Sequence, residues 1–362
     1  MHASCWSLRV GEGRGRRRMR VLMTGHDGYI GAVLAPFLTA EGHDVVGLDT
    51  RYYRDCAFGD DTPRVPVIDR DLREVGPADL AGFDAVVHLA ALSNDPVGDL
   101  NPECTYGINH RASLHLAQLA RDAGVERFLF SSSCSVYGAS SPDDVLDEEA
   151  TFAPITPYAE SKVSVEHGLL EMADDRFSPT FLRNATVYGV SPRLRGDVVV
   201  NNLVGWAVAT GKVVLKSDGS PWRPLVHVED VCRAFAAILV APRDAIHAQA
   251  FNVGRQGENY RIRTVAEMVE RAVPRSEVSF AEGAGPDPRC YRVDFSKISR
   301  MVPTFRPTWD VERGIDQLRD AFVAVGLTRD DLEGARYSRV KSILRLLEQG
   351  RVDSDLRWRK AS

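Results

Sequence analysis

The chain has 362 residues, enough for one large or two medium-sized domains with a substantial core. Apolar residues make up 44% and charged residues 26%, and the net charge of −5 gives no reason to expect binding to nucleic acid or to an anionic membrane. The six cysteines lack the spacing of metal ligands, which favours reduced thiols in a cytoplasmic protein over disulfides or a metal site. The longest apolar run, at 234–241, is too short to cross a bilayer.

The first 18 residues differ in character from the rest of the chain. They contain five arginines and no apolar run long enough for a secretion signal. This composition predicts a disordered basic extension, 1–18, ahead of a natural start at Met19. The alternative is a basic arm that contacts a partner.

Strand and helix patterns alternate through the first half of the chain. Strands are predicted at 20–25, 43–49, within 83–92 and at 127–133, and amphipathic helices at 30–38 and 108–123. Pro36 removes a hydrogen bond from the first helix, and Gly124 follows the second as a C-terminal cap. Such alternation is typical of βαβ units, so we expect an α/β protein with a Rossmann-type, doubly wound parallel sheet.

After about residue 180 the alternation loosens, and Pro, Gly and Arg become frequent. We expect a dinucleotide-binding domain over 19–182, to which a segment near 225–255 returns, and a smaller substrate-binding lobe formed mainly by 183–330. Residues 331–362 then form a C-terminal helix and tail. Apolar residues recur at helical spacing in this tail, which predicts that it packs on the protein's own body.

A glycine-rich loop follows the first strand and opens the first helix. Gly25, Gly28 and Gly31 allow a tight turn and a close approach of the backbone to a diphosphate, and the helix N-terminus supplies free N–H groups. Asp49 ends the second strand, where a carboxylate accepts hydrogen bonds from the hydroxyls of an adenine ribose. Because this acid repels a 2′-phosphate, the pattern predicts NAD, while the arginines of 51–54 keep NADP open.

Tyr158 and Lys162 stand four positions apart, on one face of a predicted helix. Such a pair is usually a solvated surface, but beside a nicotinamide cofactor it has a chemical use. The lysine ammonium and the positive nicotinamide ring both favour the phenolate of a tyrosine, whose ordinary pKa is about 10. The phenolate takes a hydroxyl proton while hydride leaves the same carbon. Ser133, at the end of a strand, supplies a hydroxyl that holds the substrate oxygen.

Several short motifs accompany these residues, namely "HLAA" (88–91), "SSSCSVYG" (131–138), "PYAESK" (157–162) and "LRNATVYG" (182–189). With the glycine loop they make the chain resemble the extended short-chain dehydrogenase/reductase family. More narrowly, the chain is similar to its NAD-dependent nucleotide-sugar epimerase/dehydratase branch. The resemblance runs from about Met19 to about Trp309 and implies a catalytic triad of Ser133, Tyr158 and Lys162.

The resemblance also implies two sets of ligand contacts. The implied cofactor contacts are Gly25, Asp27, Gly28, Tyr29, Ile30, Gly31, Asp49, Asp71, Leu72, Leu89, Ala90, Ala91, Asn109, Ser131, Tyr158 and Lys162. The implied substrate contacts are Ser133, Ser135, Thr186, Arg193, Asn201, Asn202, Arg223 and Arg289. In this assignment Arg223 and Arg289 meet the nucleotide diphosphate, and Arg292 competes with Arg289.

The reaction type follows from two positions just before "VYG". Dehydrating relatives place an Asp-Glu pair there and decarboxylating relatives usually keep the Glu, whereas this chain has Cys134 and Ser135. We therefore expect an epimerase of a nucleotide-diphosphate sugar, most simply at C4, that uses NAD and passes through a keto sugar. Cys134 is expected to be a packed small residue and not an acid or base.

Three alternatives stay open. Thr186 is similar to the uronate 4-epimerases, in which an arginine holds the sugar carboxylate, and Arg193 or Arg195 offers that role. The second alternative is an NAD(P)H-dependent keto-sugar reductase. The third is a dinucleotide-binding regulatory protein without catalysis, which the intact triad disfavours. The resemblance further implies a homodimer.

Overall fold

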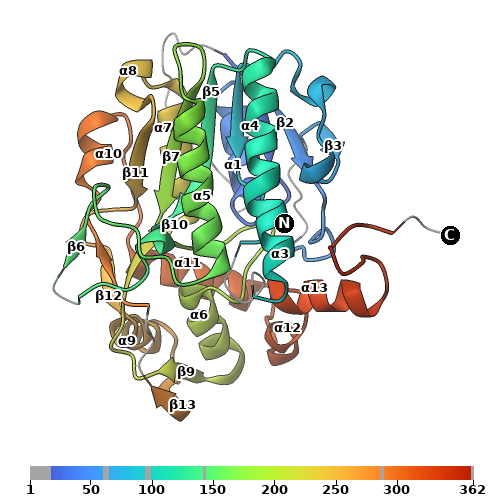
Figure 1. Ribbon diagram of the computed structural model, residues 1–362. Coiled ribbons are helices and arrows are strands. Elements are labelled where there is room, and N and C mark those ends of the chain that lie inside the picture. The colour runs from blue at the N-terminus through green and yellow to red at the C-terminus, as the bar shows by residue number, and fades with distance from the viewer. Residues whose placement is uncertain (1–17, 60–64, 94–98, 142–143, 286–288, 360–362) are drawn as a thin grey trace.

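The computed structural model describes residues 18–59, 65–93, 99–141, 144–285 and 289–359. Within these residues, a parallel sheet of seven strands carries helices on both faces (Figure 1). From one edge to the other its strands are β11 (Gln249–Val253), β7 (Ser178–Asn184), β5 (Arg127–Ser133), β4 (Ala85–His88), β1 (Arg20–Thr24), β2 (Asp44–Asp49) and β3 (Val67–Asp69). The chain builds outward from β1 to β3 and then from β4 in the opposite direction, as in doubly wound dinucleotide-binding folds. The expected fold class is confirmed.

Different helices cover the two faces of the sheet. Because side chains alternate along a strand, Val21 enters one apolar core and Leu22 the other. The helices that close the first core are α1 (Gly31–Ala40) and α7 (Val228–Val240), and those that close the second are α4 (Ala112–Asp122) and α5 (Pro157–Met172). Figure 1 shows α4 and α5 side by side across one face.

A second lobe with its own core lies below the sheet in Figure 1. Its helices and strands are α6 (Val199–Thr210), α9 (Ile262–Ala272), α11 (Val311–Ala324), β8 (Thr186–Tyr188), β9 (Lys212–Ser217), β10 (Trp222–His227), β12 (Asn259–Arg261) and β13 (Glu277–Gly285). Shorter elements are α3 (Pro102–Thr105), α8 (Arg243–Ile246), α10 (Ser296–Met301), β6 (Val145–Leu146) and β14 (Arg292–Val293). Between the two lobes the segment near 225–255 returns to the sheet as α7 and β11.

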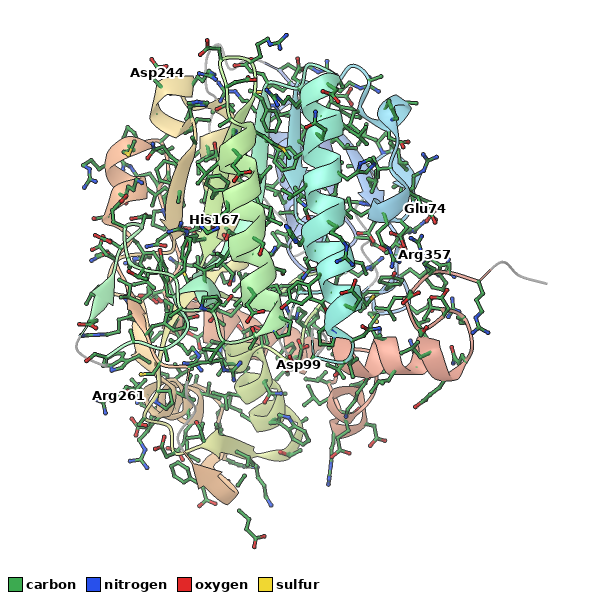
Figure 2. All side chains as sticks on the ribbon, in the orientation of Figure 1. Glu74, Asp99, His167, Asp244, Arg261 and Arg357 are labelled. Atoms are coloured by element: carbon green, nitrogen blue, oxygen red, sulfur yellow. The ribbon has the colours of Figure 1, made fainter. Side chains whose placement is uncertain are left out.

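The C-terminal segment folds back onto the sheet domain, in agreement with its apolar pattern. It contains α12 (Arg329–Glu333) and α13 (Arg339–Glu348), and its Ile343 and Leu346 are buried with Tyr52 of the loop after β2. At the surface Arg357 pairs with Glu74 at 2.8 Å (Figure 2). This segment therefore joins the end of the chain to the loop that follows Asp49.

The elements expected from the pattern are present with small shifts. Gly124 has a φ of 80°, the left-handed conformation of a helix cap, and Pro36 lies inside α1. The helix expected at 108–123 begins with a π-helical turn, Tyr106–Arg111, which leads into α4. The expected basic extension lies outside the described residues, apart from Arg18. In the described part of the chain, no helix combines the length and apolar character needed to cross a membrane.

Candidate active site

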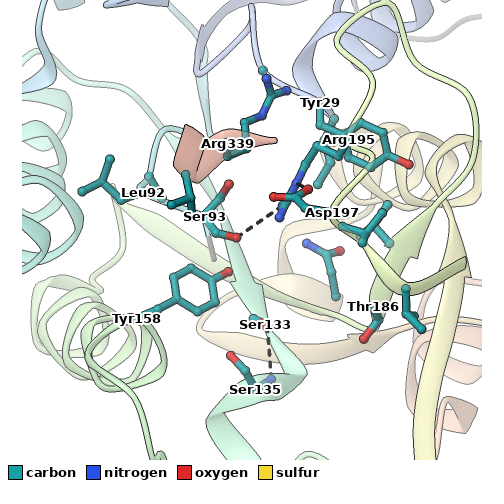
Figure 3. Close-up of a pocket in the computed structure, with 18 of the residues that line it drawn as sticks. Tyr29, Leu92, Ser93, Ser133, Ser135, Tyr158, Thr186, Arg195, Asp197 and Arg339 are labelled. Atoms are coloured by element: carbon teal, nitrogen blue, oxygen red, sulfur yellow. Dashed lines mark hydrogen bonds and ion pairs between the residues drawn. The ribbon is translucent and has the colours of Figure 1, made fainter. Parts of the chain in front are cut away.

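A cavity of about 1210 Å³ lies at the carboxyl ends of the sheet strands, where open α/β sheets bind their ligands. Its walls come from the glycine loop, the ends of β2, β4 and β5, the first turn of α5, the second lobe and the C-terminal segment. Figure 3 shows the side chains of Tyr158, Arg195 and Thr186 facing this cavity from different elements.

The glycine loop leaves no room for side chains where it meets the loop after β4. Gly25 has a φ of 72°, and a Cβ there would lie 2.7 Å from the backbone nitrogen of Ala90. A Cβ on Gly31 would collide with the carbonyl oxygen of Gly25. The exposed backbone and the start of α1 therefore form a cradle that fits the diphosphate of a dinucleotide.

Asp49 lies in the cavity wall and is fixed by two backbone N–H groups. Its carboxylate accepts hydrogen bonds from the nitrogen of Asp27 at 3.1 Å and from that of Arg51 at 2.6 Å. Burial raises the pKa of this carboxyl. The Arg51 side chain is near two other acids, at 3.8 Å from Asp27 and 3.7 Å from Asp69. A fixed carboxylate at the end of β2 fits the hydroxyls of an adenine ribose, so the site accepts NAD.

Most of the expected cofactor residues line this cavity. They are Gly25, Gly28, Tyr29, Ile30, Gly31, Asp49, Asp71, Leu72, Leu89, Ala90, Ala91, Ser131, Tyr158 and Lys162. The other two, Asp27 and Asn109, lie behind its wall. Asn109 accepts a hydrogen bond from Leu92 N at 2.8 Å and donates to Leu92 O at 3.1 Å and Ser161 Oγ at 3.3 Å. It thereby ties the loop after β4 to α5, next to the catalytic candidates.

The three catalytic candidates converge on the cavity from two elements. Ser133 ends β5, while Tyr158 and Lys162 lie one turn apart on α5, which Thr156 caps through a hydrogen bond to Ala159 N at 3.2 Å. The ammonium of Lys162 donates to the carbonyl of Ser131 at 2.7 Å. In Figure 3 the phenol of Tyr158 points into the cavity.

Lys162 is the charged group of this trio and it is almost fully buried. Burial lowers its pKa to about 7. Its ammonium lies 5.6 Å from the centre of the Tyr158 ring and 4.6 Å from that of Phe130. A negative charge on the nearby phenol would stabilise the protonated lysine, so the two groups favour each other's charged forms.

Cys134 and Ser135, which follow the triad serine, face different surroundings. Cys134 is fully buried, outside the cavity lining, and its thiol contacts the carbonyl of Arg183 at 3.2 Å. Burial raises the pKa of this thiol. Ser135 lines the cavity, and its backbone N–H donates to Ser133 Oγ at 3.1 Å. The packed role expected of Cys134 agrees with this environment.

The second lobe contributes four of the expected substrate residues to the cavity, namely Thr186, Asn202, Arg223 and Arg289. Arg223 donates to the carbonyl of Arg289, which brings these two guanidinium-bearing residues together. Arg292 does not belong to the lining. The structure thus places Arg289, and not Arg292, where a substrate diphosphate would lie.

Two expected substrate residues have structural partners outside the cavity lining. Asn201 is fully buried and its amide joins Gly189 N at 2.9 Å, Tyr29 Oη at 3.1 Å and Arg195 O at 2.9 Å. It thus fastens the second lobe to the glycine loop. Arg193 is also buried and forms an ion pair with Asp27 of that loop at 2.6 Å.

Several cavity residues were missed from the sequence, among them Tyr52, Tyr53, Ser93, Asp197 and Arg339. Arg195, which the sequence offered as an alternative to Arg193, also lines the cavity, pairs with Asp197 at 2.8 Å and donates to Ser93 O at 3.4 Å (Figure 3). No local motif marks these positions. In the described residues, no group of three or more His, Cys, Asp and Glu side chains is placed to hold a metal ion.

The sequence model of the NAD dependent epimerase/dehydratase family matches residues 21–254. The chain belongs to this family. Its members are NAD-dependent enzymes, in agreement with the cradle and the ribose carboxylate described above, and the relatives that follow act on nucleotide sugars.

Individual relatives carry out different reactions within this family. UDP-glucuronic acid decarboxylase 1 from Arabidopsis thaliana is 26% identical over 339 residues, which is 90% of this chain and 75% of the relative. UDP-glucose 4-epimerase from Neisseria gonorrhoeae is 28% identical over 335 residues, 83% of this chain and 96% of the relative. The structure of MoeE5 with UDP-glucuronic acid and NAD has a TM-score of 0.74 at 27% identity and covers 84% of this chain and 99% of that one. Family membership therefore fixes the cofactor and leaves the reaction to the site.

Proposed function

We propose that this family member is an NAD-dependent epimerase that inverts C4 of a nucleotide-diphosphate sugar through a transient keto sugar. The observation that carries the proposal is the convergence of Ser133, Tyr158 and Lys162 on one cavity whose described acids are unsuited to elimination. Such a site supports oxidation of a carbon that bears a hydroxyl, followed by reduction of the same carbon.

The chain's own part in this chemistry is to move one proton. Tyr158, as phenolate, takes the proton of the C4 hydroxyl and returns it at the end of the cycle. Ser133 donates a hydrogen bond to the same oxygen, and Lys162 stabilises the phenolate. NAD, when bound, supplies reversible hydride acceptance. Return of the hydrogen to the opposite face of C4 gives the epimer and leaves the oxidation state of the sugar unchanged.

The acids in the cavity lining are poor proton donors for a leaving hydroxyl. Burial works to raise the pKa of Asp197, but the Arg195 guanidinium more than offsets this and holds it below its ordinary value. Asp49 and Asp71 lie at the end that fits the adenosine, and Glu333 is exposed and pairs with Arg329 at 2.8 Å. Epimerisation, which needs no such donor, is therefore favoured over dehydration.

The nucleotide diphosphate of the substrate fits the second lobe. Arg223 and Arg289 lie together in the cavity wall, and guanidinium groups suit phosphate oxygens because they donate two parallel hydrogen bonds. Asn202 lines the same wall, and its side-chain amide donates to Gly196 O at 2.7 Å. We assign these three residues to the substrate nucleotide.

A UDP-uronate 4-epimerase is the second candidate, and one observation favours it. Arg195 reaches the cavity near Ser93, opposite Tyr158 in Figure 3, whereas Arg193 is held by Asp27 outside the lining. Of the two arginines, Arg195 is the one placed to meet a carboxylate on the sugar.

The test is to incubate the purified protein, without added cofactor, with UDP-, dTDP-, GDP- and CDP-sugars that include UDP-glucose and UDP-glucuronate. Products are assigned by NMR. The proposal predicts an equilibrium mixture of one substrate and its 4-epimer, and the substrate that reacts decides between a neutral sugar and a uronate. A 4-keto-6-deoxy product or a pentose formed with release of CO₂ contradicts the proposal. Turnover only with NADH and a keto sugar identifies a reductase, and no turnover with any of them a non-catalytic protein.

Two further expectations are part of this proposal. The resemblance to the family predicts a homodimer, which sedimentation measurements on the full chain would test. The composition and cysteine usage predict a cytoplasmic location, which fractionation of cells would test.

A further inference from the structure

Three arginines meet at one wall of the cavity together with two carboxylates. Arg193 pairs with Asp27 at 2.6 Å, and Arg195 pairs with Asp197 at 2.8 Å. Arg339, the third, comes from α13 and takes part in none of the ion pairs found among the described residues. Because a buried charge is costly unless it is paired, the site has one positive charge that a ligand can neutralise.

Arg339 is held firmly although it has no ionic partner in the described protein. It is 2% exposed, and its guanidinium lies 4.0 Å from the centre of the Tyr53 ring. Its side chain donates to the carbonyl of Arg193 at 2.8 Å, and its backbone N–H donates to Asp197. Burial lowers the pKa of the guanidinium, and nearby Asp197 does not offset this. An anion in the cavity would remove this penalty.

The position of Arg339 relates it to the dinucleotide end of the cavity. It lies near enough to Tyr29 of the glycine loop to act on the pKa of that phenol. On its other side, Tyr53 follows Asp49 by four residues. Figure 3 shows the guanidinium of Arg339 directed away from Tyr158. A dinucleotide that places its adenine ribose at Asp49 and its nicotinamide at Tyr158 must pass its diphosphate along the glycine loop between them.

The C-terminal segment is fastened over this end of the cavity. Trp358 Nε1 donates to Thr50 O at 2.6 Å, and the Tyr52 hydroxyl donates to the carbonyl of Leu356. Arg73 also donates to Leu356 O, at 3.3 Å. These contacts hold the segment against the residues that follow Asp49, so Arg339 enters the cavity only when the segment is folded back.

We propose that Arg339 binds the diphosphate of the dinucleotide, as a cationic clamp that the C-terminal segment brings to the cavity. The diphosphate supplies the negative charge that the wall lacks, and a planar guanidinium binds two phosphate oxygens at once. The consequence is strong retention of the cofactor, which an enzyme that regenerates NAD in every cycle requires. The inference rests on NAD binding and not on which sugar reaction follows.

The test uses the full chain freed of bound nucleotide, with ADP and adenosine as calorimetric probes that differ in the diphosphate. Arg339→Gln removes the charge and keeps the length of the side chain. We expect the affinity for ADP to fall about tenfold or more and that for adenosine to stay within about twofold. Arg339→Lys should keep part of the ADP affinity, because it keeps the charge. Arg357→Gln is the matched control, an arginine of the same segment outside the cavity lining, and should bind both probes as the wild type does.

Each remaining outcome decides against the clamp. Unchanged ADP affinity in Arg339→Gln, or equal losses for ADP and adenosine, overturns it. Unchanged ADP affinity with a raised KM for a nucleotide sugar assigns Arg339 to the substrate instead. If Arg339→Gln does not fold, limited proteolysis of the wild type decides: ADP, but not adenosine, should slow cleavage within 329–359, and equal protection by both contradicts the clamp. None of these readouts depends on epimerase activity.

Discussion

The ammonium of Lys162 lies 5.6 Å from the centre of the Tyr158 ring and 2.7 Å from the carbonyl oxygen of Ser131. Two neighbours therefore hold one cation: the strand end fixes its position, and the helix places it beside the phenol. Because the ammonium is buried, its charge is stabilised by a phenolate and its proton is lost readily without one. This coupling between the two side chains underlies the first two predictions.

Removal of the phenol hydroxyl should stop catalysis and leave the fold intact. Tyr158→Phe keeps the ring on α5 but lacks the group that accepts the sugar proton, so we expect turnover to fall by about a thousandfold or more. The amount of NAD bound per protein should not change. Tyr106→Phe is the control, a surface tyrosine that bonds to Glu160 outside the cavity lining, and it should keep normal turnover. Near-normal activity of Tyr158→Phe would assign the base to another residue.

Lys162 should give the nucleotide-free protein a pH-dependent stability. Burial lowers its pKa from 10.5 to about 7. Between these values the unfolded chain keeps the proton and the folded protein releases it, so stability rises with pH across this window, and the full cost of burying the ammonium is felt below pH 7. In Lys162→Met the rise that this residue contributes should disappear.

Urea unfolding of wild type and Lys162→Met between about pH 6.5 and 9.5 measures this effect. The free energy of unfolding of the wild type, relative to the variant, should increase as the pH rises. Lys212→Met, which alters an exposed lysine of β9, should follow the wild type. A constant difference between wild type and Lys162→Met across the window contradicts the prediction.

Gly25 should tolerate no side chain. Its φ of 72° and the distance of 2.7 Å from a built Cβ to Ala90 N mean that alanine strains the backbone and pushes the two loops apart. We expect Gly25→Ala to lose about 1–3 kcal/mol of unfolding free energy and most of its affinity for ADP. Gly76→Ala, at a φ of −122° with open space around it, is the control and should lose neither. Full ADP affinity in Gly25→Ala would argue against the cradle.

Asp49 should set the preference for NAD over NADP. Asp49→Asn removes the negative charge that repels a 2′-phosphate but keeps an acceptor for the backbone N–H groups of Asp27 and Arg51. The ratio of the dissociation constants for NADP and NAD should fall by about tenfold, as equilibrium titration with both dinucleotides would show. Asp69→Asn, an exposed acid of β3, should leave the ratio unchanged. The same ratio in both variants would remove Asp49 from the ribose site.

Local patterns in the sequence predicted the part of the site that rests on regular structure. Gly25, Asp49 and Ser133 follow or end buried strands, and parallel strands bring their carboxyl ends to one edge, so their meeting follows from the fold class. Tyr158 and Lys162 share one helical face by their spacing alone.

Loop geometry and distant packing decided the rest. Whether Asn201 or its neighbour faces the cavity depends on the direction in which α6 starts, and Arg193 turns away because Asp27, far back in the chain, holds it. Arg339 lies 314 positions after Gly25 (339 − 25) and reaches the same cavity only through tertiary packing of the tail. A lone arginine that opens an apolar helix was the available signal, and it is too common on protein surfaces to be decisive.

The central claim is that one sugar carbon gives up its hydrogen as hydride and recovers the same hydrogen. Conversion of UDP-glucose and UDP-glucuronate in D₂O, followed by NMR, tests this most directly. The account predicts a 4-epimer with no deuterium on carbon, because the hydride never exchanges with solvent. Deuterium at C5 of the product would show that a C–H proton is removed by a base, and would contradict the account.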